Sequence, residues 1–170
     1  MKVKKKNKLR LIFHFYFLDL LKLLILKKKR YSGVLVKSND KVLLCKRNNE
    51  GSLPGEWSIP GGSIEIDETP IDGAVREFYE ETNLEIVAPI TLCGMLKRYT
   101  RDGKNVKGLM YTFLMETDNE IMPDLERASD GSEHTECGYY TYDELPEPIG
   151  EQLKKLINII LSKKKVDKLN

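Results

Sequence analysis

Three closely spaced glutamates form the group of residues in this chain best suited to chemistry. Glu77, Glu80 and Glu81 occur in the run REFYEE, which begins at Arg76. At about 100° per residue, a helix places the three carboxylates on one side. Carboxylates spaced this closely repel one another and destabilise a helix, so a positive charge is expected among them. Oxygen ligands favour a hard ion such as Mg²⁺ or Mn²⁺; the alternative is a solvated acidic helix face.

The helix that would carry these glutamates has recognisable ends. Thr69 is a hydroxyl N-cap, Pro70 suits the first helical position, and Asp72 places an acid in the first turn. Asn83 tolerates the left-handed conformation that often ends a helix. The pattern predicts a helix over residues 70–82, whose apolar side contains Ile71, Val75 and Phe78.

The segment from Gly62 to Leu84 extends this pattern into a longer motif. Five residues separate Gly62 from Glu68, seven separate Glu68 from Arg76, and Asn83 with Leu84 closes the segment. It resembles the signature of the Nudix hydrolases, a glycine, loop and helix unit that binds metal and pyrophosphate. The family usually has glycine where this chain has Asn83. Because asparagine tolerates the left-handed conformation, we expect the fold to survive this departure.

The resemblance implies a role for each residue of the motif. Glu80 and Glu81 are expected to be the principal metal ligands, with Glu77 as a further ligand or as the base that takes a proton from water. The Gly62 carbonyl is expected to be another ligand, since glycine lets the backbone approach an ion closely. Arg76 is expected to orient a carboxylate, and Glu80 lies within its reach four residues on.

Four other residues are candidates for the site, each with a structural alternative. Glu68 either braces the loop against the helix or holds an outer-shell water. By the resemblance, Arg47 at a strand end faces the substrate phosphates, although such arginines are usually surface residues. Trp57 fills the core or stacks on a base. The resemblance also implies an acid before the last strand, for which Glu133 is our first candidate and Glu136 the second; a solvated loop acid is the alternative.

The resemblance implies an α/β fold, the Nudix α/β/α sandwich with a mixed sheet between helices. Alternating apolar runs predict a hairpin around the Ser38-Asn39-Asp40 turn. Further strands are expected at residues 85–97, 106–116 and 137–142. A stripe of apolar residues predicts a packed C-terminal helix, and its members are Leu153, Leu156, Ile157 and Ile160.

Length and composition predict one globular domain. The chain has 170 residues, of which 41% are hydrophobic and 32% charged, which suits a single ordinary core. We expect a Nudix domain at residues 31–162, between a basic and apolar extension at residues 1–30 and a lysine-rich, disordered tail at residues 163–170. Net charge is +10 over residues 1–30, −12 over 31–150 and +4 over 151–170. The acidic body argues against a domain that grips long nucleic acid.

The N-terminal extension contains the apolar run LIFHFYFLDLLKLLIL. The run is shorter than the roughly 20 apolar residues of a spanning helix, and no small-residue cleavage site follows it. As a helix it has its polar residues on one side, which suits contact with an anionic membrane surface; the basic residues could also contact nucleic acid. The alternatives are a misplaced start, which would make the extension dispensable, and a helix packed on the domain.

The three cysteines indicate neither a disulfide framework nor a zinc site, since their number is odd and no CxxC spacing occurs. Cys45 and Cys93 lie in apolar runs and are expected to be core thiols. We therefore expect a cytoplasmic protein, with peripheral membrane association as an alternative.

These observations together predict an enzyme that uses Mg²⁺ or Mn²⁺ to hydrolyse a pyrophosphate bond. The expected substrate is a small molecule, a nucleoside diphosphate linked to another group: an ADP-ribose-like compound, a dinucleoside polyphosphate, a nucleotide sugar or a nucleoside triphosphate. A catalytically silent nucleotide-binding module and a capped-RNA hydrolase are the alternatives. The sequence leaves the substrate and the oligomeric state open.

Overall fold

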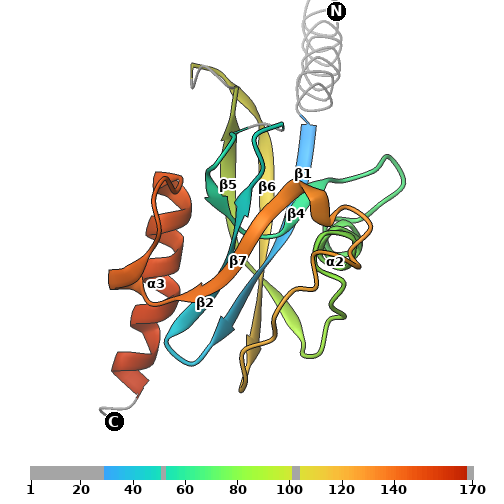
Figure 1. Cartoon of the computed structure of the whole chain (residues 1–170). Coiled ribbons are helices and arrows are strands. Elements are labelled where there is room, and N and C mark those ends of the chain that lie inside the picture. The colour runs from blue at the N-terminus through green and yellow to red at the C-terminus, as the bar shows by residue number, and fades with distance from the viewer. Residues whose placement is uncertain (1–28, 51–52, 101–103, 168–170) are drawn as a thin grey trace, which may run out of the picture.

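A computed structural model describes residues 29–50, 53–100 and 104–167 (Figure 1). The N-terminal apolar run therefore lies outside the described residues. The strands are β1 (Lys29–Ser38), β2 (Lys41–Arg47), β3 (Trp57–Ser58), β4 (Gly61–Ser63), β5 (Ile90–Tyr99), β6 (Val106–Thr117) and β7 (His134–Tyr140). The helices are α2 (Pro70–Thr82) and α3 (Glu151–Asp167), with short 3₁₀ turns η1 (Gly131–Glu133) and η2 (Tyr142–Glu144).

The strands form one mixed sheet, as expected. Its order is β3-β2-β1-β6-β5, with β4 paired to β1 and β7 paired to β2. β1 runs parallel to β6, whereas the other pairs are antiparallel. Because β1 pairs with β2, β4 and β6, it connects the two halves of the sheet.

The two long helices cover opposite faces of the sheet (Figure 1). On the α2 side, Ala74 and Phe78 are buried against residues of β1, β2 and β6. On the α3 side lies a second core cluster, which contains Leu35, Leu44, Ile59, Leu153, Leu156, Ile157 and Ile160. The α/β/α sandwich and the packed C-terminal helix are thus confirmed.

The ends of α2 follow the sequence prediction. Thr69 has extended backbone angles, and its hydroxyl accepts a hydrogen bond from the Asp72 N–H. Asn83 takes the left-handed conformation at φ 56° and donates its backbone N–H to the Tyr79 carbonyl. The apolar side of the helix is narrower than expected, because Val75 is 39% exposed.

Several predicted boundaries are wrong. The strand expected from residue 85 begins at Ile90, after a stretch without regular structure. The last strand begins at His134 and ends at Tyr140. The C-terminal helix continues to Asp167, so residues 163–167 are helical where disorder was expected; lysine is a good helix former. The predicted hairpin around Asn39 is confirmed, and Asn39 has a φ of 55°.

The prediction that the cysteines form no disulfide is also wrong, since Cys45 and Cys137 are bonded to each other. They lie directly opposite in the antiparallel pairing of β2 with β7, 92 residues apart in the chain. Only this long-range register brings them together. Cys93 packs against the α3-side core, as expected.

No helix within the described parts of the chain is long and apolar enough to cross a membrane.

Candidate active site

The guanidinium of Arg76 contacts three carboxylates, which belong to Glu68, Glu77 and Glu80. Its Nε donates to Glu68 Oε1 at 2.7 Å and its Nη2 to Glu68 Oε2 at 3.0 Å, so this pair is bidentate. Its Nη1 lies 2.7 Å from Glu80 Oε2 and 3.0 Å from Glu77 Oε1. Nη2 also donates to the Ser63 carbonyl. One guanidinium therefore holds the loop before α2, the strand β4 and two helix glutamates together.

Glu81 has a different environment from Glu77 and Glu80. It is only 2% exposed, and among the described residues its carboxylate accepts one hydrogen bond, from the Gly61 N–H at 2.6 Å. The pKa of Glu81 is raised to about 8, mainly by burial and also by the charges of Glu133 and Glu77, while the Gly61 N–H and Arg47 oppose the shift. A buried carboxylate with so little compensation is suited to accept a cation.

The glycines of β4 let the backbone approach these glutamates. A side chain on Gly62 would collide with the carboxylate of Glu77. Gly61 has a φ of 153°, and a side chain there would collide with the backbone of Ser32 and Gly33 on β1. The β4 backbone, Glu77 and Glu81 consequently meet at one junction between β4 and α2. The junction includes Gly62, as the motif implied.

Glu77 is mostly buried at this junction, with a side chain that is 14% exposed. Burial raises its pKa; Arg76 lowers it, and the nearby charges of Glu80 and Glu133 raise it. A carboxylate with a raised pKa takes up a proton more readily than an exposed carboxylate with an ordinary pKa. The position agrees with either role expected for Glu77, ligand or base.

Arg47 and Glu133 lie at the same end of the sheet. Arg47 is 8% exposed, and its Nη2 donates to Glu133 Oε2 at 2.9 Å. The Glu133 carbonyl accepts from the Asn48 N–H at 2.8 Å, which fixes the 3₁₀ turn against the end of β2. Glu136, the second candidate, pairs instead with Lys46 on an exposed part of the same two strands. Glu133 thus lies beside the glutamates of α2, and Glu136 does not.

The oxygen-only donor set suits a hard divalent cation. Within the described residues, however, no three His, Cys, Asp or Glu side chains are already gathered as a metal-binding group. Glu77 and Glu80 are paired with Arg76 in this structure, and they share its single positive charge with Glu68. The buried charge of Glu81 and the close Gly62 backbone are the features that fit a metal ion.

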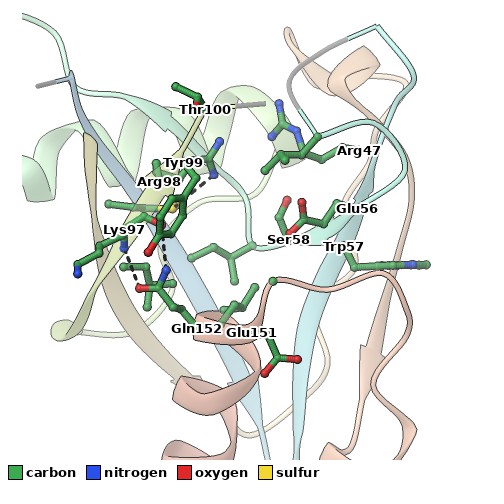
Figure 2. Close-up of a pocket in the computed structure, with 16 residues that line it drawn as sticks. Arg47, Glu56, Trp57, Ser58, Lys97, Arg98, Tyr99, Thr100, Glu151 and Gln152 are labelled. Atoms are coloured by element: carbon green, nitrogen blue, oxygen red, sulfur yellow. Dashed lines mark hydrogen bonds between the residues drawn. The ribbon is translucent and has the colours of Figure 1, made fainter. Parts of the chain in front are cut away.

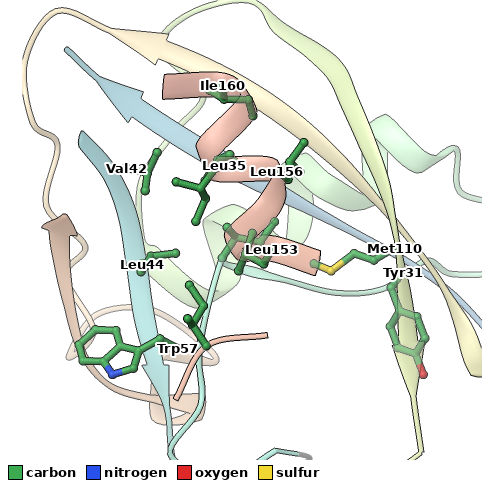
Figure 3. Packing of buried hydrophobic residues seen from close by; sticks show 12 residues of the cluster. Tyr31, Leu35, Val42, Leu44, Trp57, Met110, Leu153, Leu156 and Ile160 are labelled. Carbon is green, nitrogen blue, oxygen red and sulfur yellow. The ribbon is translucent and has the colours of Figure 1, made fainter. Parts of the chain in front are cut away.

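A cavity of about 450 Å³ opens next to this junction (Figure 2). Arg47 belongs to both places, because it lines the cavity and binds Glu133. The other walls come from residues 53–59, from β5 and from the start of α3. Figure 3 shows the core beneath it, in which Tyr31, Met110 and Leu153 belong to the same cluster as Trp57.

Trp57 lies at the wall of the cavity, but its ring is directed away from it (Figure 2). The residue is 6% exposed, and its ring packs edge-on against Tyr140 at 5.3 Å with Lys46 nearby. This position agrees with the core-filling alternative rather than with base stacking. Glu68 likewise occupies the position of a loop brace, through its two contacts with Arg76.

Sequence reasoning assigned no role to three residues near the site, and it expected one of them, His134, to be a polar loop residue. Arg98 and Glu56 line the cavity from opposite sides, and neither belongs to a motif. His134 is 4% exposed, and burial followed by the charge of Arg47 lowers its pKa to about 4. It is therefore a neutral, buried side chain at ordinary pH. Its position opposite Arg47 follows from the register of β2 with β7, which leaves no local signal.

The comparisons with known proteins agree with this geometry. A family model described as the NUDIX domain matches residues 27–158. A MutT-like protein from Streptomyces ambofaciens is 32% identical over 120 residues, which are 71% of this chain and 68% of that protein. An 8-oxo-dGTP diphosphatase from Proteus vulgaris is 31% identical over 78 residues, which are 45% of this chain and 66% of that protein. The matched parts span about two thirds of these relatives.

Among solved structures, a MutT NUDIX hydrolase from Burkholderia pseudomallei has a TM-score of 0.65 and 20% sequence identity. The match covers 77% of this chain and 96% of that one, and it shows that the two share a fold. Because the family model extends over most of the sequence, including the whole of α2 and its glutamates, the chain belongs to the Nudix hydrolase family.

Proposed function

We propose that this chain hydrolyses a pyrophosphate bond in a nucleoside diphosphate linked to another group, with Mg²⁺ or Mn²⁺ as cofactor. The observation that supports this most is the junction of Glu77, Glu81 and the Gly62 backbone beside a cavity. Its volume of about 450 Å³ lies within the range of small-molecule sites. Carboxylates and a ligand cavity are thus adjacent.

A divalent cation held by Glu80, Glu81 and the Gly62 carbonyl would neutralise phosphate oxygens and lower the pKa of water. Arg76 keeps the glutamates in position through its contacts with Glu68, Glu77 and Glu80. Glu77, whose pKa is raised by burial, is the side chain we assign as the base that takes the proton of the attacking water.

Arg47 and Glu133 connect the carboxylates to the cavity. We assign Arg47 to the phosphates, because its guanidinium faces both places and a guanidinium binds phosphate oxygens in pairs. Glu133 holds Arg47 in that position and contributes a further acid near Glu77 and Glu81. A small-molecule nucleotide is the partner that this arrangement suits.

The family hydrolyses several substrates that share the diphosphate. ADP-ribose-like compounds, dinucleoside polyphosphates, nucleotide sugars and nucleoside triphosphates all remain in the proposal. The name of the Proteus vulgaris relative, an 8-oxo-dGTP diphosphatase, favours the triphosphates. The net charge of −12 over residues 31–150 opposes long capped RNA.

The test is phosphate or nucleotide release across this substrate panel, measured with Mg²⁺, with Mn²⁺ and with a chelator. The wild-type chain is compared with Glu81→Gln and with the matched control Glu136→Gln, whose carboxylate is exposed and pairs with Lys46. We expect turnover of one substrate class that falls about a thousandfold in Glu81→Gln and is unchanged in Glu136→Gln.

The same assay tests the alternative function, which is a nucleotide-binding module without catalytic activity. It is favoured by one observation, namely that Glu77 and Glu80 already have a cationic partner in Arg76. Tight nucleotide binding without turnover, equal in wild type and Glu81→Gln, would replace the hydrolase by that module.

We also propose a cytoplasmic location, where free nucleotides are abundant. The Cys45–Cys137 disulfide opposes this proposal, since disulfides are rare in a reducing cytosol. Alkylation of rapidly quenched cells followed by mass spectrometry measures whether these cysteines are bonded in the cell. Reduced cysteines support the cytoplasm, and a complete disulfide contradicts it.

A further inference from the structure

The cavity contains two opposite charges that are not paired with each other. Arg98 and Glu56 both line it, and both side chains are half-buried. Among the described residues, the Glu56 carboxylate accepts no hydrogen bond and forms no ion pair, and the Arg98 guanidinium forms no ion pair. The two side chains still attract each other electrostatically: burial raises the pKa of Glu56 and lowers that of Arg98, and their mutual attraction opposes both shifts. The contacts of the Arg98 guanidinium are the Met110 sulfur at 3.9 Å and the Tyr31 ring at 5.2 Å. Their hydrogen-bonding groups therefore remain available to a ligand.

The backbone holds each of these two residues in a defined place. Glu56 accepts the Arg47 N–H at 3.0 Å through its carbonyl and donates its N–H to Leu53 at 3.2 Å. Arg98 pairs with Gly108 in the β5–β6 ladder. A side chain on Gly108 would collide first with the Lys29 carbonyl of β1 and then with the Tyr31 ring, which lies under the Arg98 guanidinium. The backbones of Glu56 and Arg98 are therefore held in place by hydrogen bonds to β2 and β6 respectively.

The space between them is lined by apolar side chains and one unsatisfied hydroxyl. Leu53, Ile59, Leu96 and Met110 contribute apolar walls. The Ser58 hydroxyl is buried without a hydrogen-bond partner in the described structure and lines the same space. Figure 2 shows Glu56 and Ser58 on the side opposite Arg98. Apolar walls with a few converging polar groups are typical of small-molecule sites, and the proposed nucleotide ligand would place its base here.

The charges of Glu56 and Arg98 determine which heterocyclic base is complementary to the cavity. Glu56 is acceptor-only when ionised and can take two neighbouring N–H groups, whereas Arg98 only donates. Guanine carries an N1–H and a 2-amino group side by side, and its O6 and N7 are acceptors that suit arginine. Adenine presents one amino group between two acceptors, so a carboxylate would face a repelling lone pair. A second phosphate on Arg98 would lie near the Glu56 charge, which disfavours it.

We propose that this cavity binds a purine with a 2-amino-6-oxo edge, with Glu56 accepting from N1–H and the 2-amino group and Arg98 donating to the oxo side. The proposal rests on the proposed function for the assumption that the ligand is a nucleotide. Arg47, between the cavity and the glutamates, lies where the phosphate chain of such a nucleotide would pass.

Calorimetric binding of non-hydrolysable α,β-methylene analogues of GTP, ITP and ATP tests the proposal directly. Inosine lacks only the 2-amino group, so the GTP analogue is expected to bind about tenfold tighter than the ITP analogue and tighter still than the ATP analogue. Glu56→Gln, which keeps the shape of the side chain, is expected to bring the GTP-to-ITP ratio close to one. Arg98→Met is expected to weaken both analogues about tenfold and to leave their ratio unchanged.

Glu136→Gln serves as the matched control and is expected to keep the wild-type ratio, while equal melting temperatures verify that all variants fold. Equal affinity of the wild type for the three analogues, or a GTP-to-ITP ratio that Glu56→Gln does not change, would overturn the proposal. Binding does not require turnover, so it separates the two proposals: a guanine preference without hydrolysis contradicts only the proposed function, and hydrolysis without base preference contradicts only this one.

Discussion

The two charged regions of this molecule differ in how their charges are neutralised. At the start of α2, Arg76 contacts Glu68, Glu77 and Glu80 at 2.7, 3.0 and 2.7 Å, so three carboxylates share one positive charge within the protein. In the cavity, Arg98 and Glu56 line one space and remain unpaired. In our proposals the first region holds carboxylates for chemistry on a diphosphate, and the second selects the base. The proposals thus assign chemistry and selectivity to different elements of the fold.

Among the variants that test this difference between the two regions, Arg76→Met is expected to change stability and activity most. The substitution leaves Glu68, Glu77 and Glu80 without their common cation, and we expect it to lower the free energy of unfolding by about 2 kcal/mol. Activity should fall with stability, while the guanine preference of the cavity stays unchanged. Chemical denaturation and the analogue titration measure the two. Arg76→Lys, which keeps the charge without the bidentate geometry, should lie between wild type and Arg76→Met. A change in base preference would show that the two regions are not separable.

A pH effect of intermediate size is expected from Glu81. Burial raises its pKa to about 8 from an ordinary value of 4.5, so the folded chain binds this proton more tightly than the unfolded chain does. Its contribution to stability is therefore fully present below about pH 4.5 and is lost as the pH rises towards 8. Denaturation in metal-free buffer should show wild type losing stability over this range relative to Glu81→Gln, which has no carboxyl to ionise.

Addition of Mg²⁺ should reduce that loss in the wild type and not in the variant, because a bound cation stabilises the charged carboxylate. Parallel pH profiles for wild type and Glu81→Gln would mean that Glu81 is not the buried, uncompensated acid of the first region.

The smallest effect is expected from Asn83→Gly, at the end of α2. Asn83 already has a left-handed backbone at φ 56°, and glycine adopts this conformation without a side-chain penalty, so a gain in stability of at most about 1 kcal/mol is expected. Thermal melts detect such a shift. Activity and base preference should both match wild type, because among the described residues the Asn83 side chain forms no hydrogen bond with either region and does not line the cavity. A large loss of activity would show that the departure from the family motif has a functional role.

The sequence predicts the first region well because its determinants are local. Thr69, Asp72 and Asn83 define the ends of α2, and helical spacing alone brings Arg76 to Glu80. The mixed sheet and its two covering helices follow from the family resemblance. The metal and catalytic roles of the glutamates remain predictions.

The second region escapes sequence reasoning because it depends on long-range pairing. Arg98 reaches the cavity through the register of β5 with β6, and Glu56 through the contacts of its loop with β2. The Cys45–Cys137 bond has the same origin, since only the pairing of β2 with β7 places the two residues opposite each other. Composition and local periodicity contain no information on these registers.

Mn²⁺ binding, followed by electron paramagnetic resonance, tests directly whether the glutamates of α2 hold a divalent cation. Wild type, Glu81→Gln and Glu136→Gln are titrated under the same conditions. We expect wild type and Glu136→Gln to bind Mn²⁺ equally and Glu81→Gln to bind it about a hundredfold more weakly, because a buried ligand has lost its charge. Equal Mn²⁺ affinity in all three proteins would show that Glu81 is not a ligand of the cation.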